Sequence, residues 1–328
     1  MRKFFSLFLF VVPVLCFGQK DSVVVLNKDE MKPKYGDEPS EMKVFYSQKL
    51  INSNTVEVLR KGVLEFRVSH SFGDIGGSIG GIDQFFGLDN AADVRIGMQL
   101  GLTNKLNIIL ARDKGSYTSP LRQLYELGVK YQFMKQEEND SRHPFSLTLF
   151  ANSVVSSMEA NATPNLESSF NKFSDRTSEV VQLMIARKFG KISLQLSPTF
   201  VTRGYAINGD DKSLFAIGGG IRIPLTPKFI FIADYFHSFH SQSSKDAWAV
   251  TDTSGGRSGV KFYDALGVGF EILTQGHIFH LNFTNATDIL ENRFIPYTTK
   301  SWGKGEFRWG FTISRDFDMF YKKKNRKK

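Results

Sequence analysis

The sequence predicts an all-β fold, an up-and-down antiparallel transmembrane β-barrel of about 12 strands. Three observations predict it. From Val63 onward, segments of about ten to fifteen residues alternate apolar and polar side chains, which is the period of a strand with two different faces. Short and long connections alternate along the chain, and the N-terminus is typical of an exported protein.

The alternating segments define the expected strands. In the second of them, Val94, Ile96 and Met98 alternate with Arg95, Gly97 and Gln99. We expect strands at 63–73, 92–103, 105–113, 122–135, 144–158, 178–189, 191–203, 213–225, 228–240, 260–273, 277–287 and 305–317.

The connections distinguish a barrel from a sandwich. The short ones are 104, 136–143, 190, 226–227 and 274–276, and the long ones are 74–91, 114–121, 159–177, 204–212, 241–259 and 288–304. Outer-membrane barrels have short periplasmic turns and long outer loops. The Greek-key connections of a soluble sandwich would not alternate so regularly.

The first residues read as a signal peptide over 1–19. Arg2 and Lys3 precede an apolar run that extends to Phe17, and the run is too short for a transmembrane helix. The alternative is lipidation at Cys16, although Val14 and Leu15 precede it where a lipobox has small residues. Cleavage at the end of this segment would remove the single cysteine of the chain.

Two further segments flank the predicted barrel at 63–317. Residues 20–62 form an N-terminal segment that we expect in the periplasm; its part 43–60 is more apolar and could form an extra strand, a periplasmic cover or a partial plug. The basic C-terminal tail is 318–328. Of the net charge of +9, the last seven residues carry six, and Arg2 and Lys3 carry two. The rest of the chain is nearly neutral, so no nucleic-acid partner is expected.

The last predicted strand resembles the C-terminal insertion signal of outer-membrane barrels. From Arg308 to Phe317 it has polar residues, a glycine and alternating hydrophobic residues that end in an aromatic one, although the chain continues past it. We therefore expect outer-membrane lipid as the surroundings and the barrel-assembly machinery as a partner during insertion. The expected location is the cell outer membrane, with both termini in the periplasm.

Three stretches carry a family resemblance: residues 61–70 (KGVLEFRVSH), 85–89 (FFGLD) and 92–103 (ADVRIGMQLGLT). They resemble a β-barrel family of Bacteroidota-type Gram-negative bacteria, the domain of unknown function 5777. The resemblance is densest over 61–113. It implies an outer-membrane barrel, and it implies no substrate and no functional residue.

Charged side chains on the non-lipid face are the candidate functional residues. We expect them to line the lumen, as a path for a small polar solute or as ion pairs that fill it. They are Glu65, Arg67, Asp93, Arg95, Glu126, Lys130, Arg222, Asp234, Glu271, Glu306 and Arg308. The two signs nearly balance, so no charge selectivity is predicted.

The first long connection is rich in glycine and contains an apolar cluster. It lacks the Gly-Lys-Ser/Thr end of a phosphate-binding loop. Ile82, Phe85 and Phe86 have the spacing of a short amphipathic turn. This turn is predicted either to fold into the barrel mouth and constrict it, or to pack on itself.

The histidines do not indicate a metal site. His237 and His240 are three residues apart, as are His277 and His280, and on a strand this spacing places each pair on opposite faces. We expect no metal, no cofactor and no catalytic residue.

Two functions fit the sequence. The first is a narrow porin-like channel or binding barrel for a small polar solute. The second is a non-transporting structural or surface-interaction barrel with a closed lumen and functional outer loops. An open lumen would favour the first, and a lumen closed by ion pairs or by loop 74–91 would favour the second.

Overall fold

The computed structural model describes residues 42–116, 119, 121–138, 140–250 and 259–319. All of them belong to one compact unit, Glu38–Lys328. The predicted signal peptide and nearly all of the basic tail lie outside the described residues.

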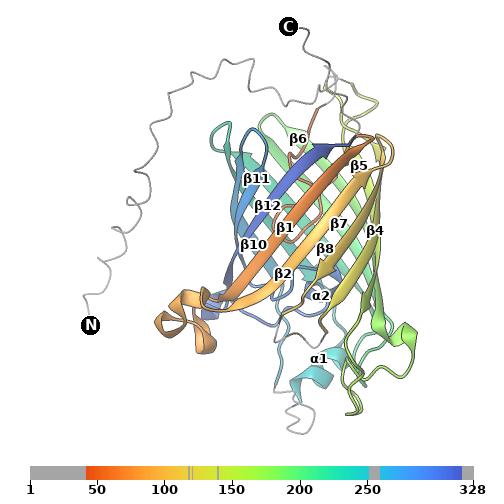
Figure 1. The fold of residues 1–328 in the computed structure, drawn as a ribbon, viewed down its shortest axis with the longest axis vertical. Helices are drawn as coiled ribbons and strands as arrows, with labels where there is room; N and C mark the ends of the chain where they lie inside the picture. Colours follow the sequence, from red (N-terminus) through yellow and green to blue (C-terminus); the bar gives the residue numbers. More distant parts are fainter. Residues whose placement is uncertain (1–41, 117–118, 120, 139, 251–258, 320–328) are drawn as a thin grey trace, which may run out of the picture. The chain divides into compact units, whose positions relative to one another are not determined.

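Twelve antiparallel strands of the described chain form a closed barrel (Figure 1). Each strand pairs with its neighbours in sequence, and β12 pairs with β1 to close the sheet. The strands are β1 (Val63–Asp74), β2 (Ala91–Gly101), β3 (Leu106–Asp113), β4 (Leu124–Met134), β5 (Ser146–Ser156), β6 (Thr177–Phe189), β7 (Ile192–Arg203), β8 (Ser213–Pro224), β9 (Phe229–Ser238), β10 (Ala265–Leu273), β11 (Ile278–Thr284) and β12 (Arg308–Asp318). The predicted fold class is confirmed.

The two rims of the barrel differ. At one rim, which we call the short-turn rim, tight connections join β2 to β3, β6 to β7, β8 to β9 and β10 to β11. The other, the long-loop rim, carries the helical turns (Figure 1). These are η2 (Gly77–Ile79), η3 (Ile82–Gly87), η4 (Phe173–Arg176), α1 (Gln242–Ala249), α2 (Glu291–Phe294) and η5 (Trp302–Lys304). Among the described residues, none of the helices has the length and hydropathy needed to cross a membrane.

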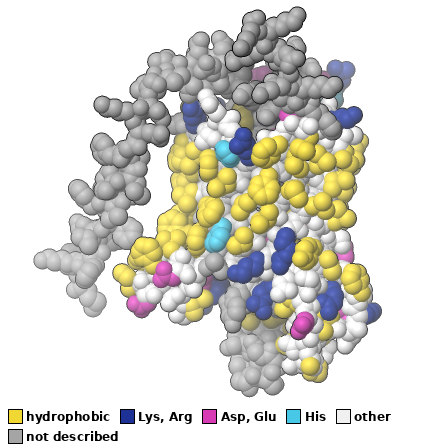
Figure 2. Space-filling view, in the orientation of Figure 1, with side chains coloured by type: hydrophobic (Ala, Val, Ile, Leu, Met, Phe, Trp, Pro, Cys, Tyr) yellow, Lys and Arg dark blue, Asp and Glu magenta, His cyan; other side chains and the backbone are white. Residues whose placement is uncertain are grey.

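The wall has an apolar outer face because side chains alternate along each strand. In β4, Leu124, Glu126 and Lys130 are buried inside, whereas Leu127 and Val129 are exposed outside. Hydrophobic side chains form a broad band around the visible face of the barrel (Figure 2). We call this band the apolar belt; it includes Phe66, Ile96, Leu110, Leu127, Ile217 and Ile313.

The chain that precedes β1 lies inside the barrel. Residues 43–59, which we call the lumen segment, are buried almost throughout. Its middle forms a tight reversal in which the Leu50 amide donates to the Ser53 carbonyl at 2.9 Å and the Thr55 amide donates to the Gln48 carbonyl at 3.0 Å. An extra strand, a periplasmic cover and a partial plug were the three arrangements expected for this stretch. The structure has the plug, because the segment lies inside the barrel.

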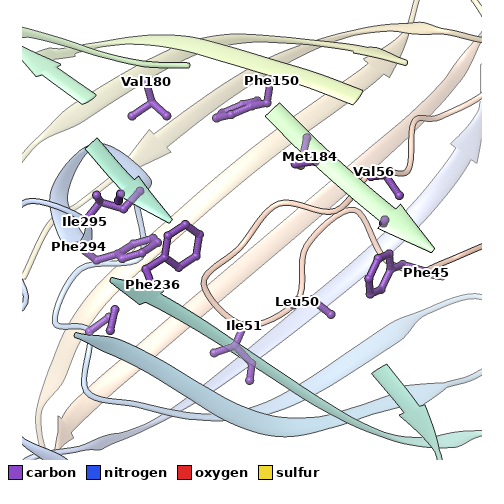
Figure 3. Close-up of a cluster of buried hydrophobic side chains, with 14 of the residues drawn as sticks. Phe45, Leu50, Ile51, Val56, Phe150, Val180, Met184, Phe236, Phe294 and Ile295 are labelled. Atoms are coloured by element: carbon purple, nitrogen blue, oxygen red, sulfur yellow. The ribbon is translucent and has the colours of Figure 1, made fainter. Parts of the chain in front are cut away.

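Part of the lumen is apolar, in addition to the charged side chains that were expected to line it. Phe45, Leu50, Ile51 and Val56 of the lumen segment belong to a buried hydrophobic cluster (Figure 3). The wall contributes inward-facing apolar side chains to it, including Phe150, Met184, Ile230, Ile232 and Phe236. These side chains pack in the lumen because the lumen segment shields them from water.

A second segment enters from the long-loop rim. Residues 285–298, which we call the inner loop, are buried over most of their length and include α2. Phe294 of the inner loop packs edge-on against Phe236 of β9, with ring centroids 5.3 Å apart. The lumen is therefore occupied from both rims by the protein's own chain.

Candidate functional site

Asp234 of β9 holds the reversal of the lumen segment. Its Oδ2 accepts hydrogen bonds from the backbone amides of Ile51, Asn52 and Ser53 at 3.0, 2.7 and 2.9 Å. Its Oδ1 accepts from the Asn52 side chain at 2.8 Å. A carboxylate that accepts several amide hydrogen bonds is stabilised in its charged form even when buried.

Other strands bind the backbone of the lumen segment in the same way. The Lys130 ammonium of β4 donates to the Glu57 carbonyl at 2.7 Å and to the Gln48 side chain at 3.1 Å. Gln195 of β7 accepts from the Val56 amide at 3.0 Å and donates to the Asn54 carbonyl at 2.7 Å.

Asn107 of β3 binds the end of the lumen segment. It accepts from the Leu59 amide at 2.7 Å and donates to the Leu59 carbonyl at 3.0 Å. The wall thereby satisfies several polar groups of the buried backbone, which is what burial without regular secondary structure requires.

Inward-facing glycines leave room for the segment. A Cβ atom at Gly220 would lie 2.5 Å from Leu50 Cδ1, and one at Gly267 would lie 2.7 Å from Ile51 Cγ2. A side chain at either position would therefore require the lumen segment to shift.

Glu291 joins the two segments that fill the lumen. Its Oε1 accepts from the Lys49 ammonium at 2.6 Å and from the Asn54 side chain at 2.8 Å. The neighbouring Asn292 donates to the Ser178 carbonyl of β6 at 2.9 Å. The lumen segment, the inner loop and the wall thus form one hydrogen-bonded unit.

Several charged side chains of the wall form ion pairs. Within β1, Arg67 pairs with Glu65 at 3.0 Å. Between strands, Arg222 pairs with Glu271 at 3.2 Å, Arg95 pairs with Glu126, and Arg308 pairs with Asp74. Such pairs balance charge inside the lumen and leave little attraction for a passing ion.

One cavity inside the barrel is small. A polar cavity between the lumen segment and β1 to β4 has a volume of ≈ 20 Å³ and is lined by Lys49, Glu65, Arg67 and Arg95 among others. About 10–15 Å³ is the minimum for one buried water molecule. The cavity is therefore of the size of a water site and not of a solute path.

Ten of the eleven predicted lumen residues are buried inside the barrel: Glu65, Arg67, Asp93, Arg95, Glu126, Lys130, Arg222, Asp234, Glu271 and Arg308. Asp93 accepts from the Ile289 amide of the inner loop at 3.0 Å. The eleventh, Glu306, is half-buried and lies outside the strand wall, because β12 begins at Arg308. Glu306 lies in the preceding loop, where it accepts from the Ser301 amide at 3.0 Å.

Two arrangements were expected for Ile82, Phe85 and Phe86, and the structure does not place them in the barrel mouth. Residues 75–90, which we call the side loop, turn away from the barrel axis beside the ends of β1 and β2 (Figure 1). Ile82 is 76% exposed and Phe85 is 60% exposed. The mouth is filled by the inner loop instead.

The long connections are tied together by a buried ion network, which we call the cap network. Glu167 accepts from Arg203 at 3.1 Å and from Arg293 at 3.0 Å, and Arg203 also pairs with Asp210 at 2.9 Å. Burial raises the pKa of a carboxyl group, but the two guanidinium groups outweigh it and hold the pKa of Glu167 below its ordinary value. Asp210 in turn accepts from Ser244 of α1 at 2.6 Å.

The lumen contacts that the sequence analysis did not predict are mainly made by side-chain amides of asparagine and glutamine. Asn107, Gln195 and Asn292 bind backbone or side chains inside the lumen, as described above. Asn107 and Gln195 occupy inward positions of alternating strands, so strand parity could have found them. Asn292 lies in a loop, and no local pattern marks its burial.

One group of potential metal ligands is present among the described residues. Glu137, Asp140 and His143 lie together between β4 and β5. His143 Nδ1 is 3.0 Å from Asp140 Oδ2, and Arg142 also binds that carboxylate at 3.2 Å. Asp140 is thus already engaged by a neighbouring cation.

Comparisons with known proteins agree with the barrel. The model of a family described as "Membrane bound beta barrel domain (DUF5777)" matches residues 45–317. No curated protein sequence matches the chain significantly. An up-and-down antiparallel barrel in a membrane is the architecture of outer-membrane proteins.

Several solved barrels are similar in fold. The KdgM porin in complex with disordered oligogalacturonate is 8% identical, with 78% of this chain and 99% of that one covered and a TM-score of 0.44. The COG4313 outer membrane channel from Pseudomonas putida F1 is 12% identical, with 80% and 98% covered and a TM-score of 0.44. LpxR from Salmonella typhimurium is 11% identical, with 78% and 99% covered and a TM-score of 0.35. The similarity extends to the barrel fold alone.

Proposed function

Because this chain belongs to the family of membrane-bound β-barrel domains DUF5777, we propose that it is a closed outer-membrane barrel that anchors a rigid cap of outer loops and conducts no solute at rest. The proposed role includes no chemical reaction. The short-turn rim faces the periplasm, with both termini on that side, because outer-membrane barrels place short turns there and long loops outside.

The observation that carries this proposal is the filled lumen. The lumen segment occupies the barrel interior and is bonded to wall residues on β3, β4, β7 and β9. Barrels of eight strands hold only side chains, whereas those with 16 or more leave a channel. A barrel of twelve strands has the room for an inserted segment, and the occupied interior weighs against a permanently open path for a small polar solute.

A second observation supports the role of the outer loops. The cap network connects the β5–β6, β7–β8 and β11–β12 connections through Glu167, Arg203 and Arg293. Loops held by buried ion pairs present a fixed surface, which reduces the ordering cost of binding a partner.

Single-channel conductance in planar bilayers tests the closed lumen. The folded full-length protein, with insertion verified by protease protection, should give no conductance steps. A variant without residues 43–59 should give steps, because the wall groups that bound the segment would face water. Reproducible steps from the unaltered protein would overturn the proposal, and continued silence of the shortened protein would overturn the role of the lumen segment as its closure.

A point substitution gives a milder test of the same element. Asp234→Ala leaves three amides of the lumen segment without an acceptor, so brief openings should appear. The matched control is Asp246→Ala on α1, an exposed position outside the lumen. If neither variant gave conductance steps, Asp234 would not be what holds the segment in place.

A further inference from the structure

The side loop exposes several large apolar side chains, and a contiguous exposed apolar patch is typical of an interaction surface. Ile79 is 52% exposed, Ile82 76%, Phe85 60% and Leu88 41%. These four residues recur at every third position. They cannot be part of a mouth constriction because the loop extends away from the barrel axis (Figure 1).

The loop is held in this position by specific contacts. The Ile75 and Gly76 amides donate to the carbonyls of Phe307 and Gly305 at 2.7 and 2.9 Å. At its base, a Cβ atom on Gly87 would lie 2.3 Å from the Gly73 carbonyl oxygen of β1, so only glycine permits this approach. These hydrogen bonds and this close approach therefore hold the apolar side chains of the loop outside the barrel.

The backbone of η3 supports the same conclusion. Phe85 and Phe86 have φ values of 44° and 54°, in the left-handed region that large side chains rarely adopt. The Phe86 amide donates to the Gly81 carbonyl at 2.8 Å, and the Asn90 side chain donates to Gln84 at 2.6 Å. Internal hydrogen bonds thus fix a conformation in which Phe85 remains exposed.

The apolar surface of the side loop continues the apolar belt. The outer face of β1 and β12 carries Phe72 and Phe311, with ring centroids 6.0 Å apart, close to the origin of the loop. Figure 2 shows hydrophobic side chains of this projection beside the band on the barrel wall, with acidic side chains also present. Asp83 and Asp89 are the exposed acidic residues of the loop.

We propose that the side loop is a membrane-interface anchor whose apolar side chains insert into the lipid leaflet that surrounds the long-loop rim. The occupant is lipid because the loop extends sideways from the wall, at the margin of the surface that lipid already covers. Apolar side chains on a polar segment bind at the boundary between headgroups and acyl chains in this way. This inference is independent of whether the lumen conducts.

Spin labels at single cysteines test the depth of the loop. The only native cysteine is Cys16, so Cys16→Ser in the full chain gives a background without thiols. Phe85→Cys and Ile82→Cys label the side loop, Leu127→Cys labels the apolar belt, and Lys245→Cys labels exposed α1. Each protein is folded into phosphatidylcholine vesicles, and collision of the label with oxygen and with a nickel chelate is measured.

The ratio of oxygen collisions to nickel-chelate collisions should be similar for the labels at 82, 85 and 127. At 82 and 85 this ratio should exceed the ratio at 245 by at least several fold. Collision with nickel equal to that at 245 would overturn the proposal. Protection from both reagents, with dipolar broadening between labels on different molecules, would identify a second copy of the chain as the occupant and would also overturn it.

Discussion

The buried side chain of Asp288, in the inner loop, links the stability of the fold to pH. It is 1% exposed, and its Oδ1 accepts from the Ser116 amide at 3.0 Å. Burial, opposed by the charge of Arg293 and assisted by that of Asp93, raises the pKa of Asp288 to about 6. The folded protein therefore holds this proton more tightly than the unfolded chain does.

Protonation of Asp288 thus stabilises the fold at low pH. This contribution is complete below the unfolded pKa of about 4 and is lost as the pH rises through the folded value. Asp288→Asn should raise the free energy of unfolding by up to about 3 kcal/mol at pH 7.5 and change it little at pH 4. Urea unfolding in vesicles at both pH values measures this, with Asp246→Asn as an exposed control. Destabilisation by Asp288→Asn at pH 7.5 would mean that Arg293 requires the charged carboxylate.

At the scale of elements, the cap network predicts that the outer loops move together. Glu167→Gln leaves the buried Arg293 without its carboxylate partner. Loss of one member of a buried ion pair costs about 3–5 kcal/mol. Hydrogen exchange should become faster in both the β5–β6 and the β11–β12 connections, with the strands unchanged. Glu159→Gln, an exposed change in the same connection, should alter neither, and an effect confined to one connection would contradict the network.

The elements also show what the sequence can and cannot predict. The strands were predictable because alternation and turn residues are local: β7 was expected at 191–203 and spans Ile192–Arg203. The sequence offered a partial plug as one of three alternatives for the lumen segment and could not choose it, because the partners of this segment are remote in sequence; Asn52 binds Asp234, 182 residues away. The sequence left two arrangements open for Ile82 and Phe85 for a similar reason, since spacing reveals an apolar cluster but not the direction of its loop.

Some signals of the filled lumen were nevertheless present. The run Phe229 to Ala233 is apolar on both faces, which is typical of a strand that is buried on both sides. Ile230 and Ile232 indeed face the lumen segment and are 0% exposed. The inward glycines Gly220 and Gly267 indicate a close approach by another part of the chain. Alternation along each strand identifies the charged residues that face the lumen. Which of them form ion pairs depends on contacts between residues that are distant in sequence.

At the scale of the whole molecule, the apolar belt fixes the barrel in its membrane. Leu127 of β4 is 57% exposed on this surface. Leu127→Arg should lower the free energy of unfolding in vesicles by about 2–4 kcal/mol, as charged residues on the lipid face of such barrels do. Val250→Arg, at a similarly exposed site at the end of α1, should have little effect. Equal effects at both positions would contradict the assignment of the belt to lipid.

The position of the lumen segment also has a consequence for the order of assembly. Although this segment precedes every strand, it is bonded to Asn107 of β3, Gln195 of β7, Asp234 of β9 and Glu291 of the inner loop. The Lys49–Glu291 contact spans 242 residues. Contacts of such long range form late in folding, because the intervening chain must be ordered first. We therefore expect the first-synthesised part of the barrel unit to dock last, after the wall has closed.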